Sequence, residues 1–479
     1  MLTPEIAWRA IAPIVALAGG GVLTLLMVSL NRRMHRGALA GVSLASLGAA
    51  AWFTVDLRDR QTVGMQGMLA ADGVALFGSI ILIGSAALAI LLAYEYLSAR
   101  GIHRPEFYPL LLFATAGMVL LTSANDLLMV FLAIEILSLA LYVLTALARR
   151  DDKSQEAALK YFLLGAFASA FLLYGIALAY GATATTNIAR ISEVIASSPP
   201  RLAFLAFAMI AAGLGFKIAA VPFHMWTPDV YQGAPTPVTA FMAAGTKTAA
   251  FVALLRVFLV GFGSLEWDWQ PLLWVVAVAS MSLGAVVAIV QSDVKRMLAY
   301  SSIAHAGYLL VGVIASSRDG TTSVLYYMAV YAIATMGAFG LVLATAAGGK
   351  ERLDIASWQG IGRRSPAFAG AMTLFLLSLA GIPPTAGFMG KFFVFRAAID
   401  SGEVALVVAG LVTSVVAAFF YLRLVVMMWM QDPPAGDQGV APSRVLIAGI
   451  ALIAAATIAL GVWPQELLDL ARGASVFLG

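Results

Sequence analysis

Long apolar stretches alternate with short polar loops along the chain, and this pattern predicts repeated passage through a membrane. A membrane-spanning helix needs about 20 predominantly apolar residues. About fourteen stretches are long enough or nearly so, which predicts an all-α polytopic membrane protein with about fourteen transmembrane helices. They lie at residues 5–30, 37–55, 72–97, 107–123, 125–147, 156–181, 202–230, 236–261, 272–290, 296–316, 322–346, 366–399, 403–430 and 443–463.

The loops between these stretches are too short for a folded soluble domain, so the helices themselves define the organisation. We expect three N-terminal helices, a first five-helix unit, a second five-helix unit, and a last helix with a C-terminal tail. These four parts are residues 1–104, 105–262, 270–430 and 440–479.

Prolines interrupt two of the predicted helices: Pro222 lies within the seventh, and Pro383 and Pro384 lie within the twelfth. A proline has no N–H and its ring clashes with the carbonyl four residues earlier, so both helices are expected to break. The two helices are five apart in order and therefore run in opposite directions. Helices 4–8 and 9–13 are thus predicted to form two repeats of inverted topology, an arrangement typical of transporters.

Composition excludes several classes of protein. Hydrophobic residues make up 61% of the chain and charged residues 11%, whereas soluble domains carry about 25% charged residues. The net charge of +4 is too small for a nucleic-acid partner. The absence of cysteine excludes disulfides, iron–sulfur clusters and cysteine-ligated zinc.

Basic residues predict the orientation in the membrane. Arg32, Arg33 and Arg36 follow the first apolar stretch instead of preceding it, so this stretch is a transmembrane helix and not a cleaved signal peptide. If the N-terminus is placed outside and the loops are assigned alternately to the two sides, lysine and arginine are about twice as frequent in the inside loops as in the outside loops. We therefore expect both termini outside. The Ala/Gly-rich composition favours a bacterial chain, which puts the termini in the periplasm and the protein in the inner membrane.

Ionisable residues within the helices are the candidate functional groups, because a charge at the bilayer centre costs about 2.5–3.5 kcal/mol. Lys247 lies about 16 Å into its helix and Glu135 about 15 Å into its own. Lys217 and Lys391 each accompany a proline break. Lys160 is shallower, and its amine could equally reach the membrane surface. Arg256 lies near a helix end, and its side chain is expected to reach the membrane surface.

Glu135 has a structural and a functional interpretation, and the two are compatible. An ion pair with a buried lysine would allow both charges to exist there. A lysine balanced between desolvation and a nearby carboxylate can also take up and release a proton. The tenth helix offers only Ser301, Ser302 and His305 in place of this glutamate.

Two histidines, His224 and His305, are the only ones within predicted helices. Two histidines without a third ligand make a metal site improbable, so no metal is expected. For each, a packing role and a proton-relay role stay open. The sequence has no glycine-rich loop that follows a strand and could bind phosphate, so no cofactor is expected in this chain.

Four stretches resemble the antiporter-like subunits of respiratory complex I (NADH:quinone oxidoreductase), of Mrp antiporters and of membrane-bound hydrogenases. The resemblance extends over about residues 70–430, and its motifs are long. They are DLLMVFLAIE at 126–135, KIAAVPFHMWTPDVYQGAPTP at 217–237, DVKRMLAYSSIAH at 293–305 and GIPPTAGFMGKF at 381–392.

Within this family the chain is most similar to the N-type subunit of complex I, which has HMWTPDVY where residues 224–231 stand. M-type subunits have a glutamate at the position of Lys391, and L-type subunits continue into a long lateral helix. The resemblance implies roles for individual residues. They are a coupled ion pair for Glu135 and Lys217, a central relay for Lys247, an exit-side lysine for Lys391, a place in the central polar axis for His305, and a less defined role for Lys160.

The resemblance implies a proton-translocating subunit of the complex I membrane arm that moves protons from cytoplasm to periplasm. Its partners would be other membrane subunits, including the M-type and K-type neighbours and the lateral helix of the L-type subunit, together with lipid and internal water. Flavin, iron–sulfur clusters and quinone would belong to partner subunits, whose redox chemistry supplies the energy. The alternatives are an Mrp-type cation/proton antiporter or hydrogenase-linked ion pump, and a structural scaffold.

Overall fold

The computed structural model describes residues 7–31, 35–102, 104–197, 201–348, 350–434, 439–440 and 444–478, so Arg32 and Arg33 lie outside the described residues. Within these ranges the chain is almost entirely helical, as predicted, and its one sheet is a two-stranded antiparallel hairpin. The N-terminal part contains α1 (Trp8–Leu30), α2 (Arg36–Asp56), β1 (Thr62–Gly64), η1 (Met65–Gly67), β2 (Leu69–Ala71) and α3 (Gly73–Ala99).

The next part contains the first broken helix and a helix with two π-helical segments. Its elements are α4 (Phe107–Ser123), α5 (Leu127–Thr145), α6 (Asp152–Thr183), α7 (Ile188–Ser197), α8 (Arg201–Ile218), α9 (Trp226–Gly233), α10 (Thr236–Phe241), η2 (Met242–Thr246), α11 (Lys247–Leu255) and η3 (Arg256–Gly261).

The remaining part contains the second broken helix and a bent C-terminal pair. Its elements are η4 (Gly263–Leu265), α12 (Glu266–Ile289), α13 (Val294–Ile314), α14 (Arg318–Ala344), η5 (Thr345–Gly348), η6 (Ile355–Trp358), α15 (Ile361–Arg364), α16 (Pro366–Ala380), α17 (Ala386–Asp400), α18 (Val404–Met430), α19 (Arg444–Val462) and α20 (Gln465–Ala474).

Eleven helices in the described ranges are long and apolar enough to cross a membrane, or twelve when the bent α19–α20 pair is added. The predicted number of fourteen is not confirmed by this measure and stays a prediction. Two stretches account for the difference: α4 has 17 residues, and α16 and α17 have 15 each on either side of a break. The hairpin, the amphipathic helix α7 and the final helix α20 were not predicted.

Both predicted breaks are confirmed, and their backbones are alike. α8 ends before Ala219, which has a φ of 61°, and α16 ends before Gly381, which has a φ of 82°. The next N–H then reaches back in each case: Ala220 donates to the Gly215 carbonyl at 2.9 Å, and Ile382 donates to the Leu377 carbonyl at 3.0 Å. Such a left-handed residue satisfies carbonyls at a helix C-terminus. Two half-helices therefore face each break.

Aspartates start α5 and α13 in the same way. Asp126 accepts from the Leu128 N–H at 2.9 Å, and Asp293 accepts from the Arg296 N–H at 3.0 Å, which are N-caps that satisfy otherwise unpaired donors. Each aspartate also forms an isolated antiparallel bridge to the segment after the next long helix, Asp126 with Asn187 and Asp293 with Asp354. The spacing from Asp126 to Asp293 equals that from Asn187 to Asp354.

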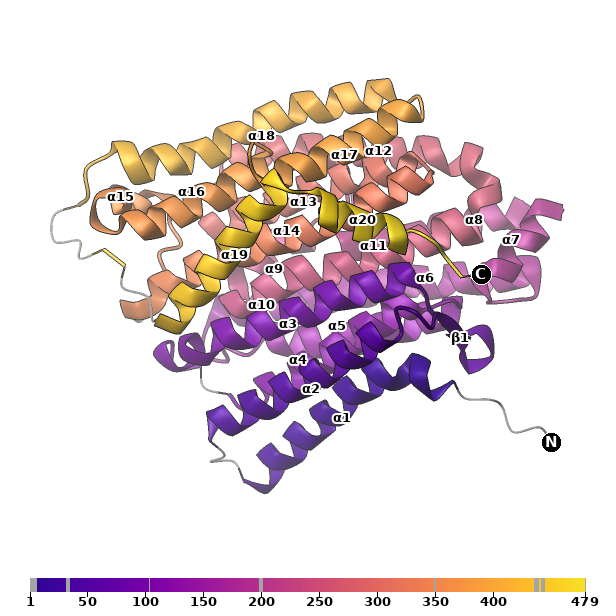
Figure 1. Cartoon of the computed structure of the whole chain (residues 1–479), viewed down its shortest axis with the longest axis horizontal. Coiled ribbons are helices and arrows are strands. Elements are labelled where there is room, and N and C mark those ends of the chain that lie inside the picture. The colour runs from indigo at the N-terminus through magenta and orange to yellow at the C-terminus, as the bar shows by residue number, and fades with distance from the viewer. Residues whose placement is uncertain are drawn as a thin grey trace.

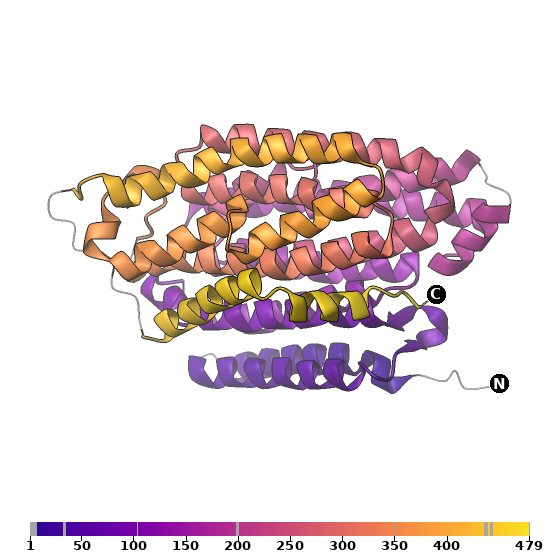
Figure 2. The same ribbon diagram turned by 45° about the horizontal axis from the view of Figure 1, so that its top comes forward.

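The helices form one elongated bundle, with the α1–α2 pair at one edge and α18 at the opposite edge (Figures 1 and 2). α1 begins and α20 ends at the same end of this bundle in both views. The contact of the Leu478 N–H with Asp72, at the start of α3, holds the C-terminal segment at that end (3.0 Å). We call it the terminal end.

Candidate functional site

Three lysines lie inside the bundle. The exposed fractions are 4% for Lys217, 2% for Lys247 and 5% for Lys391. None of the three therefore points toward lipid, and the hydrogen bonds of each amine must come from the protein or from internal water.

Lys217 stands in the last turn of α8, directly before the first break. Its Nζ donates to the Ser138 hydroxyl on α5 at 2.6 Å and lies 5.6 Å from the centre of the Tyr161 ring. Glu135, one turn before Ser138, is half-buried and accepts from the Ser169 hydroxyl at 2.5 Å. The implied ion pair is thus indirect: Ser138, not Glu135, contacts the amine.

Lys247 begins α11, immediately after the π-helical segment η2. Single π-helical turns occur frequently at functional sites. The amine contacts both the backbone carbonyl and the hydroxyl of Ser302 on α13, the latter at 2.7 Å. The Tyr331 hydroxyl on α14 donates to the same Ser302 oxygen at 2.8 Å. Lys247 is therefore joined to α13 and, through Ser302, to α14.

His305 lies one turn after Ser302 and is 2% exposed. Its Nδ1 is 2.7 Å from the Tyr327 hydroxyl and its Nε2 is 3.3 Å from the Tyr421 hydroxyl. The Tyr421 hydroxyl also contacts Ser301. Both ring nitrogens thus face groups that can donate or accept, so either neutral tautomer can be satisfied.

Lys391 lies on α17, after the second break. Its Nζ donates to the Ala380 carbonyl at 2.9 Å and to the Ser414 hydroxyl at 2.8 Å, and it lies 4.5 Å from the centre of the Tyr308 ring. The Tyr308 ring is 5.8 Å from the His305 ring. A 360 Å³ cavity adjoins the amine and is lined by Gly381, Phe388, Phe392, Phe395 and Ser414 among others.

Two groups of polar residues result. One surrounds Lys217 on α5, α6 and α8, and the other runs from Lys247 along α13 to Lys391. No hydrogen bond or ion pair within the described ranges joins Lys217 to Lys247 directly.

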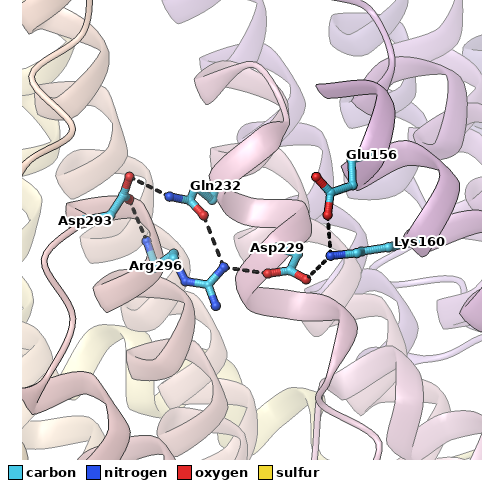
Figure 3. A network of polar contacts seen from close by, with 6 residues as sticks. All are labelled: Glu156, Lys160, Asp229, Gln232, Asp293 and Arg296. Carbon is cyan, nitrogen blue, oxygen red and sulfur yellow. Dashed lines mark hydrogen bonds and ion pairs between the residues drawn. The ribbon is translucent and has the colours of Figure 1, made fainter. Parts of the chain in front are cut away.

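Lys160 and His224 lie outside both groups. Lys160 is half-exposed and forms ion pairs with Glu156 at 2.6 Å and Asp229 at 2.7 Å (Figure 3). His224 is half-buried in the first break, and its Nδ1 has no hydrogen-bond partner among the described residues. A relay role for His224 gains no support from this position.

The hydroxyl groups were the main omission from the sequence analysis. Ser138, Tyr331 and Tyr421 contact the candidate residues or their partners. Serine and tyrosine are common in apolar helices, so the sequence positions of Tyr331 and Tyr421 alone carry no signal. For Ser138 a signal was present, because it lies three residues after Glu135 and hence on the same helix face.

The prediction that the Arg256 side chain reaches the membrane surface is wrong. Arg256 is 1% exposed and forms two contacts of 2.8 Å with Asp72, which is itself fully buried. In the described part of the chain, no three histidine, aspartate or glutamate residues come together as a possible metal site.

These buried lysines, beside two broken helices, can be compared with known proteins. The family described as "NADH:quinone oxidoreductase/Mrp antiporter, TM" matches residues 124–417. A protein of Salinispora arenicola named NADH-quinone oxidoreductase subunit N is 47% identical over 99% of this chain and 99% of its own length. The chain belongs to this antiporter-like family. The resemblance to N-type subunits is thereby confirmed.

Solved structures agree with this family membership. A chain of respiratory complex I from Thermus thermophilus superposes with a TM-score of 0.81 at 34% identity, covering 96% of this chain and 99% of that chain. A chain of the Mrp complex from Dietzia sp. superposes with a TM-score of 0.83 at 23% identity, covering 98% and 97%, and shares the fold. The protein is therefore a multi-pass integral membrane protein whose relatives are subunits of an enzyme complex.

Proposed function

We propose that this chain translocates protons from the cytoplasm to the periplasm as an N-type subunit of NADH:quinone oxidoreductase. Protons reach Lys217 beside Glu135, pass to Lys247, follow α13 past His305, and leave through Lys391. The observation that carries the proposal is the polar path along α13, where Ser302, His305 and Tyr308 link the surroundings of Lys247 to those of Lys391.

The chemistry of the contacts supports proton transfer. Each lysine amine binds a serine hydroxyl: Ser138, Ser302 or Ser414. A hydroxyl can accept from an ammonium group or donate to a neutral amine. A hydroxyl can therefore satisfy the N–H groups of the ammonium form and also the lone pair of the neutral amine, whereas a carbonyl can only accept an N–H.

The direction rests on the placement of the termini. α1 begins and α20 ends at the terminal end, and the distribution of basic residues favours placing that end in the periplasm. Moving one charge against 100 mV costs about 2.3 kcal/mol. The proposal assigns this work to redox chemistry in partner subunits, where flavin, iron–sulfur clusters and quinone would reside, coupled through the membrane arm.

The two five-helix units are proposed to be inverted repeats. The matching aspartate bridges at α5 and α13 and the similar backbones at the two breaks support this division. Its boundaries are those expected from sequence, 105–262 and 270–430. Ser302 then occupies the position in the second unit that Glu135 occupies in the first.

The deciding experiment replaces Lys217 by alanine in the intact complex and counts protons translocated per NADH oxidised in membrane vesicles. We expect the complex to assemble and the ratio to fall. Lys350→Ala is the control, because Lys350 is an exposed lysine outside the helices. An unchanged ratio in Lys217→Ala would contradict the proposal and leave the scaffold interpretation.

An Mrp-type cation/proton antiporter is the second candidate, since the family description covers Mrp proteins and the Dietzia chain shares the fold. Purification separates the two. Co-isolation with flavin and iron–sulfur subunits, and with M-type, K-type and L-type membrane partners, supports the first function. Sodium-dependent proton exchange without NADH oxidation supports the second.

A further inference from the structure

Asp229 joins three helices through its two carboxylate oxygens. It lies on α9, and its Oδ2 accepts from Lys160 Nζ on α6 at 2.7 Å. Its Oδ1 accepts from Arg296 Nη1 on α13 at 2.5 Å. Figure 3 shows the carboxylate between the two cations. Because α6 belongs to the first five-helix unit and α13 to the second, Asp229 connects the two units.

Glu156 does not provide the same connection. It also pairs with Lys160, at 2.6 Å, but it stands four residues earlier on the same helix, and its side chain is 63% exposed. The side chain of Asp229 is 32% exposed and that of Arg296 is 27% exposed. Exposed pairs within one helix contribute little. The contacts of Asp229 are the ones that hold helices together.

The first turn of α13 also holds the end of α9. Arg296 donates to the Gln232 side-chain oxygen at 3.1 Å, and the Gln232 amide donates to Asp293 at 2.9 Å. Lys295 is 1% exposed and donates to the Ala234 carbonyl at 2.6 Å. α13 is therefore attached to α9 through side chains and backbone.

α9 in turn forms part of the surroundings of Lys217. Its first residue, Trp226, donates from the indole N–H to the Phe216 carbonyl at 3.0 Å, next to Lys217 in sequence. The Trp226 ring stacks on Tyr161 with centroids 4.6 Å apart, and the Tyr161 ring lies 5.6 Å from the Lys217 amine. A shift of α9 would therefore displace the walls around that amine.

We infer that Asp229 is a positioning residue for proton loading at Lys217. Through its contact with Asp229, α13 of the second unit sets the position of α9 and of the break. The inference rests on the proposed function. It assigns a role to Lys160 and Arg296 as well, because each donates a hydrogen bond to one carboxylate oxygen of Asp229.

The test compares Asp229→Asn, which keeps the shape and removes the charge, with Asp229→Glu, which keeps the charge. Both are made in the intact complex, and protons per NADH and the amount of assembled complex are measured. We expect Asp229→Asn to lower the ratio roughly threefold to tenfold, which lies within the range that coupling energies in a contact network allow, and Asp229→Glu to recover most of it. Loss of assembly alone would lower the amount of complex without changing the ratio.

Asp400→Asn is the matched control, because Asp400 is an exposed aspartate (62%) that pairs only weakly, at 3.8 Å, with Arg396 one turn away. It should leave the ratio unchanged. Lys160→Gln in the Asp229→Asn background should add little, since the charged partner of Lys160 on α9 is already gone. Full additivity, or an unchanged ratio in Asp229→Asn, would overturn the inference. If Lys217→Ala still lowers the ratio in the same preparations, only this inference fails; if it does not, the proposed function fails.

Discussion

Lys391 donates a hydrogen bond to the carbonyl of Ala380, and this carbonyl lacks its usual helical N–H partner because of the residue four positions later. In a continuous helix the Ala380 oxygen would accept from the N–H of residue 384, but residue 384 is a proline and has none. The break thus creates an acceptor inside the bundle, and the amine of the next half-helix occupies it. A polar backbone group and a lysine satisfy one another where neither could face lipid.

Gly381 makes this contact possible, and its replacement by alanine is the first prediction. A Cβ there would lie 2.8 Å from Lys391 Cδ, at a φ of 82°. The backbone penalty is about 1 kcal/mol, and the clash would displace the lysine. We expect the complex to assemble with fewer protons translocated per NADH.

Gly402→Ala is the control for this variant, because Gly402 also has a positive φ, 89°, but nothing lies within 4 Å of its added Cβ. It shares the backbone strain without the contact. Equal effects of the two substitutions would show that strain, not the position of Lys391, is responsible.

The second prediction concerns Ser302, whose hydroxyl binds Lys247 and Tyr331 at once. Ser302→Ala leaves both partners short of a hydrogen bond in a buried site, which costs about 1–3 kcal/mol. We expect proton translocation to fall roughly fivefold or more, and Ser302→Thr to retain most of it because the hydroxyl is kept.

Ser323→Ala provides the comparison. Ser323 is similarly buried (2%), but among the described residues its hydroxyl bonds only to the Gly320 carbonyl of its own helix, at 2.7 Å. Translocation in this variant should match the unaltered protein. If Ser302→Ala also matched it, the path along α13 would have no role.

Sequence reasoning was effective where the cause is local. Proline lacks a donor wherever it stands, so both breaks could be located from Pro222 and Pro384 alone. The depth of Lys247 likewise follows from counting residues along a helix. The buried lysines were found for this reason.

Partners distant in sequence could not be found in the same way. Arg256 lies near a helix end and looked able to reach the surface, but Asp72 meets it inside the bundle from 184 positions away. Glu135 was expected to contact Lys217, yet the structure pairs it with Ser169 on the next helix. A side chain's choice among several polar neighbours depends on the rotation and packing of its helix. The apolar pattern does not determine rotation or packing when a helix is apolar on all its faces.

The buried pair of Arg256 and Asp72 is the subject of the last prediction. Removing one member of a buried pair leaves an uncompensated charge and costs about 3–5 kcal/mol. Asp72 also caps α3 through the Ala75 N–H and holds the Leu478 N–H, each at 3.0 Å. Arg256→Met should therefore lower the temperature at which this subunit unfolds in the solubilised complex and loosen the C-terminal segment, as measured by proteolysis.

Asp72→Asn added to Arg256→Met should restore part of this stability, because asparagine carries no buried charge and its amide oxygen can still accept the Ala75 N–H that begins α3. Arg396→Met is the matched control: its pair with Asp400 is exposed, 70% and 62%, and spans 3.8 Å, so its loss should change stability by less than about 1 kcal/mol. If the double variant proved no more stable than Arg256→Met alone, lost packing of the arginine, and not the unpaired carboxylate, would explain the effect.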